Sequence, residues 1–464
     1  MRTAFFIKNG RISFFLIIFL VFVSCRNSSP EIKKADPILF ELKASLESLS
    51  QIWYPRTMDT IEGGFYPDFN YRWELEGEQT KMLVTQARHL WTTSSLYAYY
   101  KDPRYLKMAK HGFEYLSTKM WDTNHGGFHT FLKPVEGIYT PQGSTKSTYA
   151  NAFAIYGLAN YYKVSGDTAA LNLAKKTFQW IDQKAYDPLY KGYFDVLQLD
   201  GTNMLLLEEN DKDYDNWIRR NWKDQNSSIH LMEAFSALYE VWPDKHLGER
   251  LTELQLLIRD TITSSKGYLY LHLERDWTPV ILKDSSETYR QENFALDHVS
   301  FGHDVETGFL LLEASHALKL QHDSITPLKA KKMIDHGIDK GWDLKLGGFF
   351  DGGYYLDDSD ECTILNRAKI WWTQAEGLNA LMLMASLYPE EKRYRRLFEA
   401  QWSYIKKELM DQTYGGWYGE GVEGNEQIRL EPKAHIWKVN YHNIRALINT
   451  IEMLEGTYVL VPEK

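Results

Sequence analysis

Three histidines, His230, His303 and His442, lie inside segments that are otherwise rich in alanine and large apolar residues. Histidine changes its charge close to neutral pH, so it can take up and release protons there. Glu306 follows His303 by three residues, a spacing that puts both side chains on one face of a helix. A carboxylate in that position can orient an imidazole and raise its basicity. The pattern predicts acid–base chemistry.

Other polar and aromatic residues occupy comparable places in the same kind of segment. Asn226 precedes His230 by four residues and Trp372 precedes Glu376 by four, so each pair also shares a helix face. Burying an unpaired polar group costs about 2–7 kcal/mol, so a buried helix rarely carries one without a partner or a function. One such residue is more often part of the core, but six buried segments with one at the same level predict a functional pocket. The remaining members of this set are Arg88, Tyr149 and Trp437.

The sequence lacks the patterns that usually hold a metal or a phosphate group. It has no His-Glu-x-x-His motif and no cysteine pair that would suit zinc. A glycine-rich phosphate loop is also missing. We therefore expect a site that works without a metal or an organic cofactor.

The elements that must position these residues are marked by a glycine-aromatic phrase that occurs six times. An amphipathic segment precedes each phrase, with the three- and four-residue spacing of a helix that has one solvent-exposed face. Glycine permits positive φ and aromatic residues favour strands, so each phrase predicts a turn and a small hairpin. The aspartate before the glycine is expected to accept backbone hydrogen bonds of the turn. The phrases span residues 59–68, 122–131, 187–196, 264–273, 343–352 and 411–420.

A second kind of segment follows each hairpin, and it is richer in apolar residues and poorer in charge, which predicts a buried helix. Exposed and buried helices therefore alternate, with 63 to 80 residues between successive glycines. We expect an all-α fold, an (α/α)6 barrel of six inner and six outer helices with short β-hairpins at one mouth. An open α-solenoid is the alternative. In the barrel, every inner helix begins at the hairpin mouth, so the candidate residues would face one pocket.

The N-terminus predicts export. Residues 1–25 combine basic residues, an apolar run and the pair Ser24–Cys25, which is typical of a lipoprotein signal peptide with Cys25 as the lipidation site. Phe22 is unusual three residues before that cysteine, so a plain signal anchor is the alternative. We expect a membrane-anchored lipoprotein of a Gram-negative-type bacterium that faces the periplasm or the outside.

The rest of the chain predicts a tether followed by one domain. Residues 26–37 are polar with two prolines and predict a flexible tether, and residues 38–464 predict a single barrel domain. The formal net charge of −9 disfavours nucleic acid as a partner. If Cys25 carries lipid, Cys362 has no cysteine left to pair with, so we expect no disulfide.

Six stretches around the candidate residues resemble the N-acylglucosamine 2-epimerase family, and within it the cellobiose and mannobiose 2-epimerases. They are MLVTQARHLWTTS, STYANAFAIYGLANYY, NSSIHLMEAFSALYEVW, SFGHDVETGFLLLEA, KIWWTQAEGLNALM and IWKVNYHNIRALI. They run in order from about residue 60 to about residue 455, so the resemblance covers most of the chain. It implies an (α/α)6 barrel and an enzyme that interconverts sugars at C2 without a redox cofactor.

The resemblance also implies roles for the acid–base residues. His303 and His442 would be the two acid/bases, one removing the C2 proton and the other returning a proton to the opposite face. His230 would act in ring opening, with Asn226 beside it. Glu306 would be a partner of the acid/base histidine.

Substrate-binding roles follow in the same way. Arg88 would lie near the C1 and C2 oxygens, where its fixed fork of donors suits an enediolate. Trp372 would be a stacking platform for the sugar, and Glu376 a polar contact. Tyr149 and Trp437 would complete the binding residues. One residue departs from the family pattern: Asn440 stands where relatives usually have proline, which puts the placement of the following histidine, or the substrate, in question.

We therefore expect an epimerase that inverts C2 of the reducing-end sugar of a β-1,4-disaccharide such as cellobiose or mannobiose. Its partner would be an oligosaccharide, its membrane contact the lipid alone, and its state a monomer. An aldose–ketose isomerase or an N-acetylglucosamine 2-epimerase of the same family is the first alternative. Two others come from different classes: an inverting glycoside hydrolase that uses Glu306, Glu376 or Asp304, and a glycan-binding lipoprotein.

Overall fold

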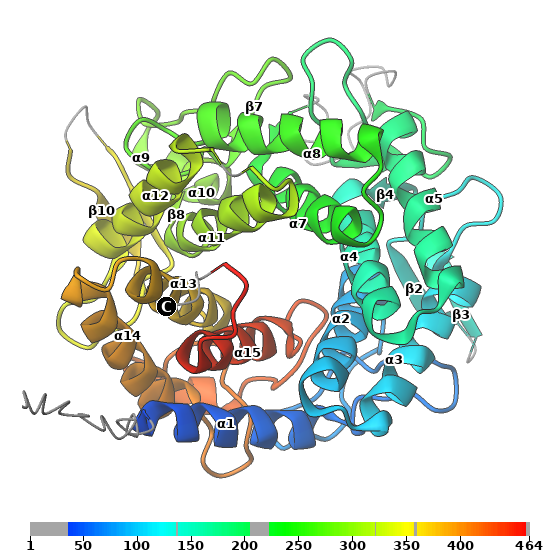
Figure 1. Ribbon diagram of the computed structural model, residues 1–464, viewed down its shortest axis with the longest axis horizontal. Coiled ribbons are helices and arrows are strands. Elements are labelled where there is room, and N and C mark those ends of the chain that lie inside the picture. The colour runs from blue at the N-terminus through cyan, green and yellow to red at the C-terminus, as the bar shows by residue number, and fades with distance from the viewer. Residues whose placement is uncertain (1–35, 136–137, 205–221, 321, 357–359, 461–464) are drawn as a thin grey trace, which may run out of the picture.

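Two concentric rings of helices make up the described part of the protein (Figure 1). The computed structural model describes residues 36–135, 138–204, 222–320, 322–356 and 360–460. The predicted signal peptide, the lipidation site Cys25 and the predicted tether up to residue 35 lie outside these ranges. Within them, no helix has both the length and the apolar character needed to cross a membrane.

The inner ring is closed. Its first and last helices, α2 and α15, contact each other, and α15 also packs against α13. This confirms the predicted (α/α)6 barrel rather than the open solenoid. The inner helices of the described chain are α2 (Leu83–Tyr100), α4 (Thr148–Ser165), α7 (Gln225–Val241), α11 (Phe301–Ala317), α13 (Trp371–Leu387) and α15 (Tyr441–Glu455).

The outer ring consists of the predicted amphipathic helices. In α14, Tyr394, Phe398 and Trp402 are buried at four-residue steps, while most of the charged residues between them face solvent. A π-helical turn continues three of these helices toward the hairpins. The outer helices of the described chain are α1 (Pro37–Trp53), α3 (Pro103–Tyr115) with η1 (Leu116–Met120), α5 (Thr168–Lys184), α8 (Lys245–Leu257) with η3 (Ile258–Ile262), α12 (Ile325–Gly341) and α14 (Lys392–Tyr404) with η4 (Ile405–Leu409).

Small antiparallel sheets lie at the mouth where outer helices lead into inner ones. Their strand orders are β1-β2-β3, β10-β9-β8, β4-β5 and β6-β7. Three short helices, α9 (Glu287–Glu292), α10 (Phe294–Asp297) and η5 (Glu426–Leu430), lie in the loops. The strands are β1 (Lys81–Met82), β2 (Phe131–Val135), β3 (Ile138–Gln142), β4 (Thr145–Ser147), β5 (Val196–Gln198), β6 (Lys223–Asp224), β7 (His272–Leu273), β8 (Val299–Ser300), β9 (Gly352–Tyr354) and β10 (Thr363–Asn366).

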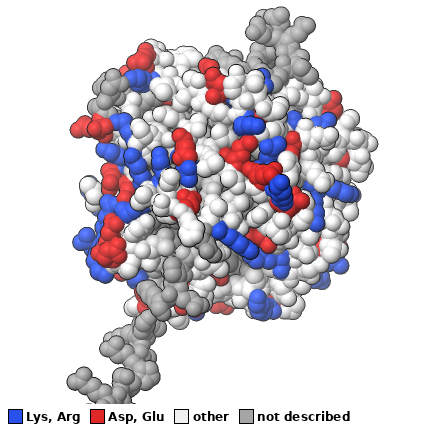
Figure 2. Space-filling model, turned by 45° about the horizontal axis from the view of Figure 1, so that its top comes forward, with Lys and Arg blue, Asp and Glu red and all other residues white. Residues whose placement is uncertain are grey.

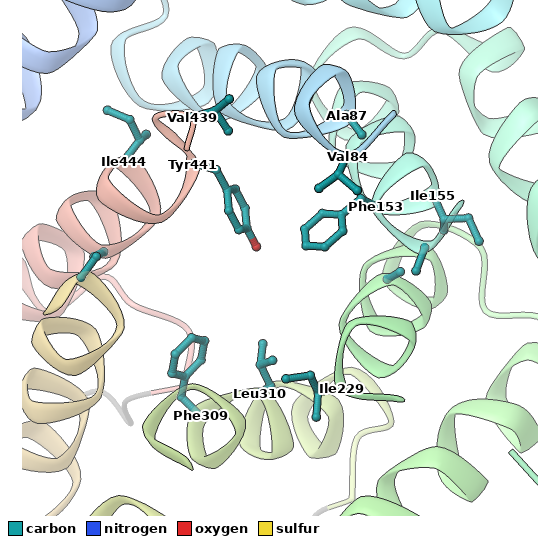
Figure 3. Packing of buried hydrophobic residues seen from close by; sticks show 14 of the residues in the cluster. Val84, Ala87, Phe153, Ile155, Ile229, Phe309, Leu310, Val439, Tyr441 and Ile444 are labelled. Carbon is teal, nitrogen blue, oxygen red and sulfur yellow. The ribbon is translucent and has the colours of Figure 1, made fainter. Parts of the chain in front are cut away.

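The inner helices are apolar on nearly all sides because they are covered by the outer ring and also face one another. Figure 3 shows Phe153, Phe309 and Tyr441 pointing into the barrel from α4, α11 and α15. Such packing is the main favourable term for a fold of this kind, at about 25 cal/mol for each Å² of apolar surface buried. On the surface shown in Figure 2, basic and acidic side chains of the described residues are interspersed.

Each glycine-aromatic phrase forms a tight turn followed by a short bridge, as the first one illustrates. Asp59 Oδ1 accepts hydrogen bonds from the backbone N–H groups of Ile61 and Glu62, at 3.0 and 2.9 Å. Gly64 has a φ of +69°, and a Cβ there would lie 2.6 Å from Oε1 of Gln86. The predicted role of the aspartate is therefore confirmed in this turn, and glycine is required for both its φ and its close contact.

A buried lysine reaches each of these aspartates from the strand or loop that precedes the next inner helix. Lys81 Nζ lies 2.6 Å from Asp59 Oδ2, and at most 1% of either side chain is exposed. Burial alone would raise the pKa of Asp59, but the hydrogen bond from Lys81 holds that pKa below its ordinary value. The equivalent pairs are Lys146–Asp122 at 2.6 Å, Lys223–Asp187 at 3.1 Å, Lys369–Asp343 at 2.8 Å and Lys433–Asp411.

The fourth turn replaces both partners of this pair. Ser264 takes the aspartate position, and its hydroxyl accepts the N–H groups of Gly267 and Tyr268. Val299 stands where the lysine would be, two residues before α11. The two changes occur together because a lysine buried without its aspartate would be strongly destabilising.

The lysine–aspartate pairs yield a stability prediction. Lys146→Val should lower the free energy of unfolding by about 3–5 kcal/mol, because Asp122 stays buried without its cation. Adding Asp122→Ser recreates the combination found in the fourth turn and should restore at least half of that loss. Urea denaturation at neutral pH measures both effects.

The matched control is Lys110→Met, which removes an ion pair with Glu114 in which both side chains are largely exposed. Such a pair is worth about 0–1 kcal/mol. If Lys146→Val cost no more than this control, the buried pair would not be what holds the turn.

Candidate active site

A cavity of about 210 Å³ lies at the hairpin mouth, where the inner helices begin. The structure brings together there all the residues predicted for the pocket except Glu376, and adds Trp371. The lining residues are Arg88, Tyr149, Asn226, His230, His303, Glu306, Trp371, Trp372, Trp437 and His442.

Helix geometry explains why these residues meet. Residues four apart on a helix share a face, and the second and sixth positions of most inner helices face the mouth. Because each helix starts at nearly the same level, these positions form two layers. The second positions are Tyr149, Asn226, Trp372 and His442, and the sixth are Arg88, His230, Glu306 and Glu376.

His442 is held by Glu376 from the neighbouring helix. His442 Nδ1 lies 2.5 Å from Glu376 Oε1, and both side chains are buried. Burial, with the nearby Arg88 guanidinium, lowers the pKa of His442 well below its ordinary value. The imidazole is therefore neutral at neutral pH, and with Nδ1 engaged, Nε2 remains for the pocket. Glu376 lies behind this ring and does not line the cavity, unlike the substrate contact predicted for it.

His303 has a different partner from the one its spacing predicted. Its Nδ1 lies 2.8 Å from the hydroxyl of Ser300, just before α11, and the Glu306 carboxylate turns to Arg445 instead. Burial, and then the nearby His230, lower the pKa of His303 to about 3. This imidazole is also neutral at neutral pH and can act as a base.

The ring of Trp372 lies beside both of these histidines. Its centroid is 4.8 Å from that of His303 and 5.9 Å from that of His442. His230 stands apart from this group and binds Glu233, with 2.8 Å between Nδ1 and Oε2. Thus each of the three histidines has its Nδ1 occupied by a neighbouring side chain.

Arg445 is one of the site residues that the sequence analysis missed, along with Glu233, Ser300 and Trp371. Its guanidinium donates to Glu233, Glu306 and Glu376, which come from three other inner helices, and only 2% of the residue is exposed. The Nη2–Oε1 distance to Glu376 is 2.7 Å. Arg445 lies three positions after His442, within the stretch that resembles the family. This spacing puts both residues on one face of a helix, and it is the signal in the sequence that could have identified Arg445.

The carboxylates of Glu306 and Glu376 lie with His442 in a cluster whose potential ligand atoms are within 4.8 Å of one another. Such a group could hold a metal ion, but Arg445 already supplies a cation to both carboxylates. Burial raises the pKa of Glu376, while Arg445 opposes that rise. The cluster therefore works as a rigid support for His442.

Arg88 supplies positive charge to the wall of the cavity. Its Nη2 donates to the Tyr149 hydroxyl at 3.2 Å, and its Nη1 to the Trp437 carbonyl at 3.4 Å. The guanidinium also lies over the Phe153 ring, 4.4 Å from the centroid. A cation fixed in this way can stabilise negative charge on two adjacent oxygens.

Two further predicted positions lie next to the pocket: Asn440, which departs from the family pattern, and Trp437. Asn440 precedes α15 with a φ of −76°, an angle that proline also adopts. The backbone at this position is therefore compatible with either residue. The Asn440 amide is buried and makes no hydrogen bond within the described chain. Trp437 lies at the rim with 45% of its surface exposed.

Comparisons with known proteins agree with this geometry. Residues 64–446 match the sequence profile of the N-acylglucosamine 2-epimerase (GlcNAc 2-epimerase) family. A cellobiose 2-epimerase from Bacteroides fragilis is 27% identical over 400 residues, covering 86% of this chain and 94% of that protein. A D-mannose isomerase from Marinomonas mediterranea is 25% identical over 418 residues, covering 89% and 97%. The solved structure of cellobiose 2-epimerase from Spirochaeta thermophila matches with a TM-score of 0.74 at 28% identity, covering 90% and 97%.

The barrel, the neutral histidines and the arginine at its mouth, and the family match together define an enzyme of the carbohydrate epimerase and isomerase class. The chain belongs to the N-acylglucosamine 2-epimerase family. This confirms the resemblance seen in the sequence.

The Arg445 cluster leads to a prediction about stability and pH. Arg445→Met should lower the free energy of unfolding by about 3–5 kcal/mol at neutral pH, because three buried carboxylates lose their shared cation. Burial alone would raise the pKa of Glu233, but Arg445 and His230 hold it at about 2. That stabilisation is complete above the unfolded pKa of about 4.3 and is lost as the pH falls toward 2. The deficit of the variant should therefore shrink by roughly half at about pH 3.

Urea denaturation at the two pH values measures this deficit. Lys110→Met, which removes an exposed ion pair with Glu114, is the control and should change stability little at either pH. An equal deficit for Arg445→Met at both pH values would contradict the role given to the cluster.

Proposed function

We propose that the protein is a sugar 2-epimerase that inverts C2 of the reducing-end sugar of a β-1,4-linked disaccharide. The observation that carries the proposal is the pair His303 and His442, two neutral imidazoles from different helices that both lie beside Trp372 in one cavity. Epimerisation at C2 needs one base to remove the proton and a second group to return one to the opposite face.

In this mechanism the open-chain aldehyde lies between the two histidines. One imidazole takes the C2 proton, and the electrons move onto the C1 oxygen to form a cis-enediolate. The other imidazole takes up a proton from solvent water and delivers it to the opposite face of C2, and the first imidazole then releases the abstracted proton to solvent. Glu376 behind His442 and Ser300 beside His303 keep the two rings in place through Nδ1.

Arg88 stabilises the enediolate. Its guanidinium lines the cavity and is fixed by Tyr149 and the Trp437 carbonyl, so its donors need little reorganisation as the charge develops. Contacts of this kind contribute roughly 3–4 kcal/mol each to transition-state stabilisation. Before this step, the sugar ring must open by moving a proton from the C1 hydroxyl to the ring oxygen. His230, oriented by Glu233 and close to Asn226, is the group we assign to that transfer.

An inverting glycoside hydrolase is supported less well. It needs an acid and a base carboxyl about 6.5–9.5 Å apart. Glu306 and Glu376 instead offer oxygens within 4.8 Å of each other and both bind Arg445. Asp304 accepts the Leu269 N–H of the fourth hairpin and binds His336. All three carboxylates thus have structural partners.

An aldose–ketose isomerase is the second candidate, because a D-mannose isomerase is among the relatives. Both reactions pass through the same enediolate and differ in whether the proton returns to C2 or to C1. Incubation with cellobiose, mannobiose, mannose and N-acetylglucosamine in D2O, followed by NMR, separates them. Epimerisation gives a new aldose with deuterium at C2, isomerisation gives a ketose, and hydrolysis doubles the reducing ends of a disaccharide.

The two acid/base histidines can be tested singly. His303→Ala and His442→Ala should each reduce net epimerisation below a tenth of the wild-type rate, because either direction of the reaction needs both groups. Circular dichroism and the thermal midpoint check that the barrel remains folded. Retention of more than a tenth of the activity by either variant would refute the two-histidine assignment, whereas deuterium exchange without net epimerisation is compatible with it.

Substrate length is tested at Trp437. This residue lines both the cavity and a larger cleft beside it, so its ring can contact the sugar beyond the reducing end. Trp437→Ala should lower kcat/KM for cellobiose or mannobiose about tenfold, and lower that for mannose much less. An equal loss on both kinds of sugar would assign the ring to the reducing-end sugar or to packing, and a wild-type preference for mannose would contradict a disaccharide substrate.

A further inference from the structure

A cleft of about 460 Å³ continues outward from the catalytic cavity. It shares Tyr149, Asn226, His303 and Trp437 with that cavity, so the two spaces are contiguous. The hairpin strands β2, β4, β5 and β7 contribute its walls. Its volume falls in the range of small-molecule sites, about 300–1,000 Å³. We call this space the outer cleft.

Two carboxylates line the outer cleft. Asp195 Oδ1 accepts from the Ser147 hydroxyl and the Tyr149 N–H, at 3.0 and 2.9 Å. Asp224 accepts from the N–H and the hydroxyl of Ser227, at 2.7 and 2.8 Å. Burial raises the pKa of Asp195 to about 6, and the repulsion between its carboxylate and that of the neighbouring Asp224 contributes to this rise.

Other atoms of the lining are acceptors as well. Oε1 of Gln225 has no hydrogen-bond partner within the described chain, although only 3% of this residue is exposed. His298 Nδ1 lies 2.8 Å from the Phe294 carbonyl, so Nδ1 carries the proton and Nε2 is an acceptor. Burial lowers the pKa of His298 to about 4, which keeps the ring neutral. Among the described residues, neither lysine nor arginine lines this cleft.

We propose that the outer cleft binds the non-reducing sugar and selects one that offers hydrogen-bond donors, hydroxyl or amine, while it excludes a sugar that carries a carboxylate. This inference rests on the proposed function. A sugar hydroxyl can donate to the two carboxylates, because each of them is an acceptor and is partly exposed. A uronic acid would bring a third negative charge next to Asp195 and Asp224, and the described lining offers no lysine or arginine to offset it.

The experiment compares cellobiose with the disaccharide in which C6 of the outer glucose is oxidised to a carboxylate. Turnover is measured by NMR, and binding by quenching of tryptophan fluorescence, which does not depend on turnover. Wild-type protein should favour cellobiose about 30-fold or more in both kcat/KM and Kd. Asp195→Asn and Asp224→Asn should each reduce this ratio at least fivefold, mainly by improving the acidic sugar. Asparagine keeps the oxygen that accepts the backbone N–H, so the local structure should persist.

The matched control is Asp200→Asn, an exposed aspartate in the turn that follows β5, outside the cleft lining. It should leave the ratio unchanged. Equal use of the two disaccharides by the wild type, no change in ratio in either cleft variant, or no disaccharide binding would overturn the inference. If the protein binds cellobiose with the expected discrimination but epimerises no sugar, the proposed function fails and the selective cleft stands. If mannose is epimerised but the acidic disaccharide is accepted, the function stands and the cleft assignment fails.

Discussion

In five of the six glycine turns, a buried lysine reaches back to the aspartate of the turn. The lysine lies in the strand or loop before the helix, and the aspartate lies in the turn after the outer helix, so the pair joins the two rings at the mouth. Buried charged groups demand close partners, which limits the freedom in the height of the helix. The site depends on that height, because its residues come from the first two turns of the inner helices.

The fourth turn lacks this pair but keeps a second contact of the repeat. Asp304 of α11 accepts the Leu269 N–H at 3.0 Å, as the fourth residue of α2, α4 and α13 accepts the equivalent N–H, and Asp304 also binds His336. Ser300, just before α11, holds His303, which stands at the third position of its helix, unlike the equivalent residues of the other helices. The local exception to the repeat thus coincides with one of the two proposed acid/base residues. Such local exceptions to a repeat are expected at functional sites, where the residues needed for function differ from those that best stabilise the fold.

A second buried charge organises the floor of the cavity. Arg445 gathers three carboxylates that would otherwise repel one another, and these in turn hold His230 and His442. Burial lowers the pKa of His442, and Glu376, which fixes this ring, lies outside the cavity lining. Arg88, which also lines the cavity, is the residue that we propose stabilises the enediolate.

Periodicity along the chain was sufficient to predict the two rings of helices, the turn at each glycine and the residues that meet at the mouth, because these follow from burial and local geometry. The partners of those residues could not be predicted in the same way. The spacing of three predicted that Glu306 would serve His303, but Arg445, 139 residues away, binds that carboxylate instead. His442 is held by Glu376, 66 residues away. In a low dielectric, the attraction between opposite charges outweighs a contact between residues one helical turn apart. Only the closed barrel brings these charged groups together.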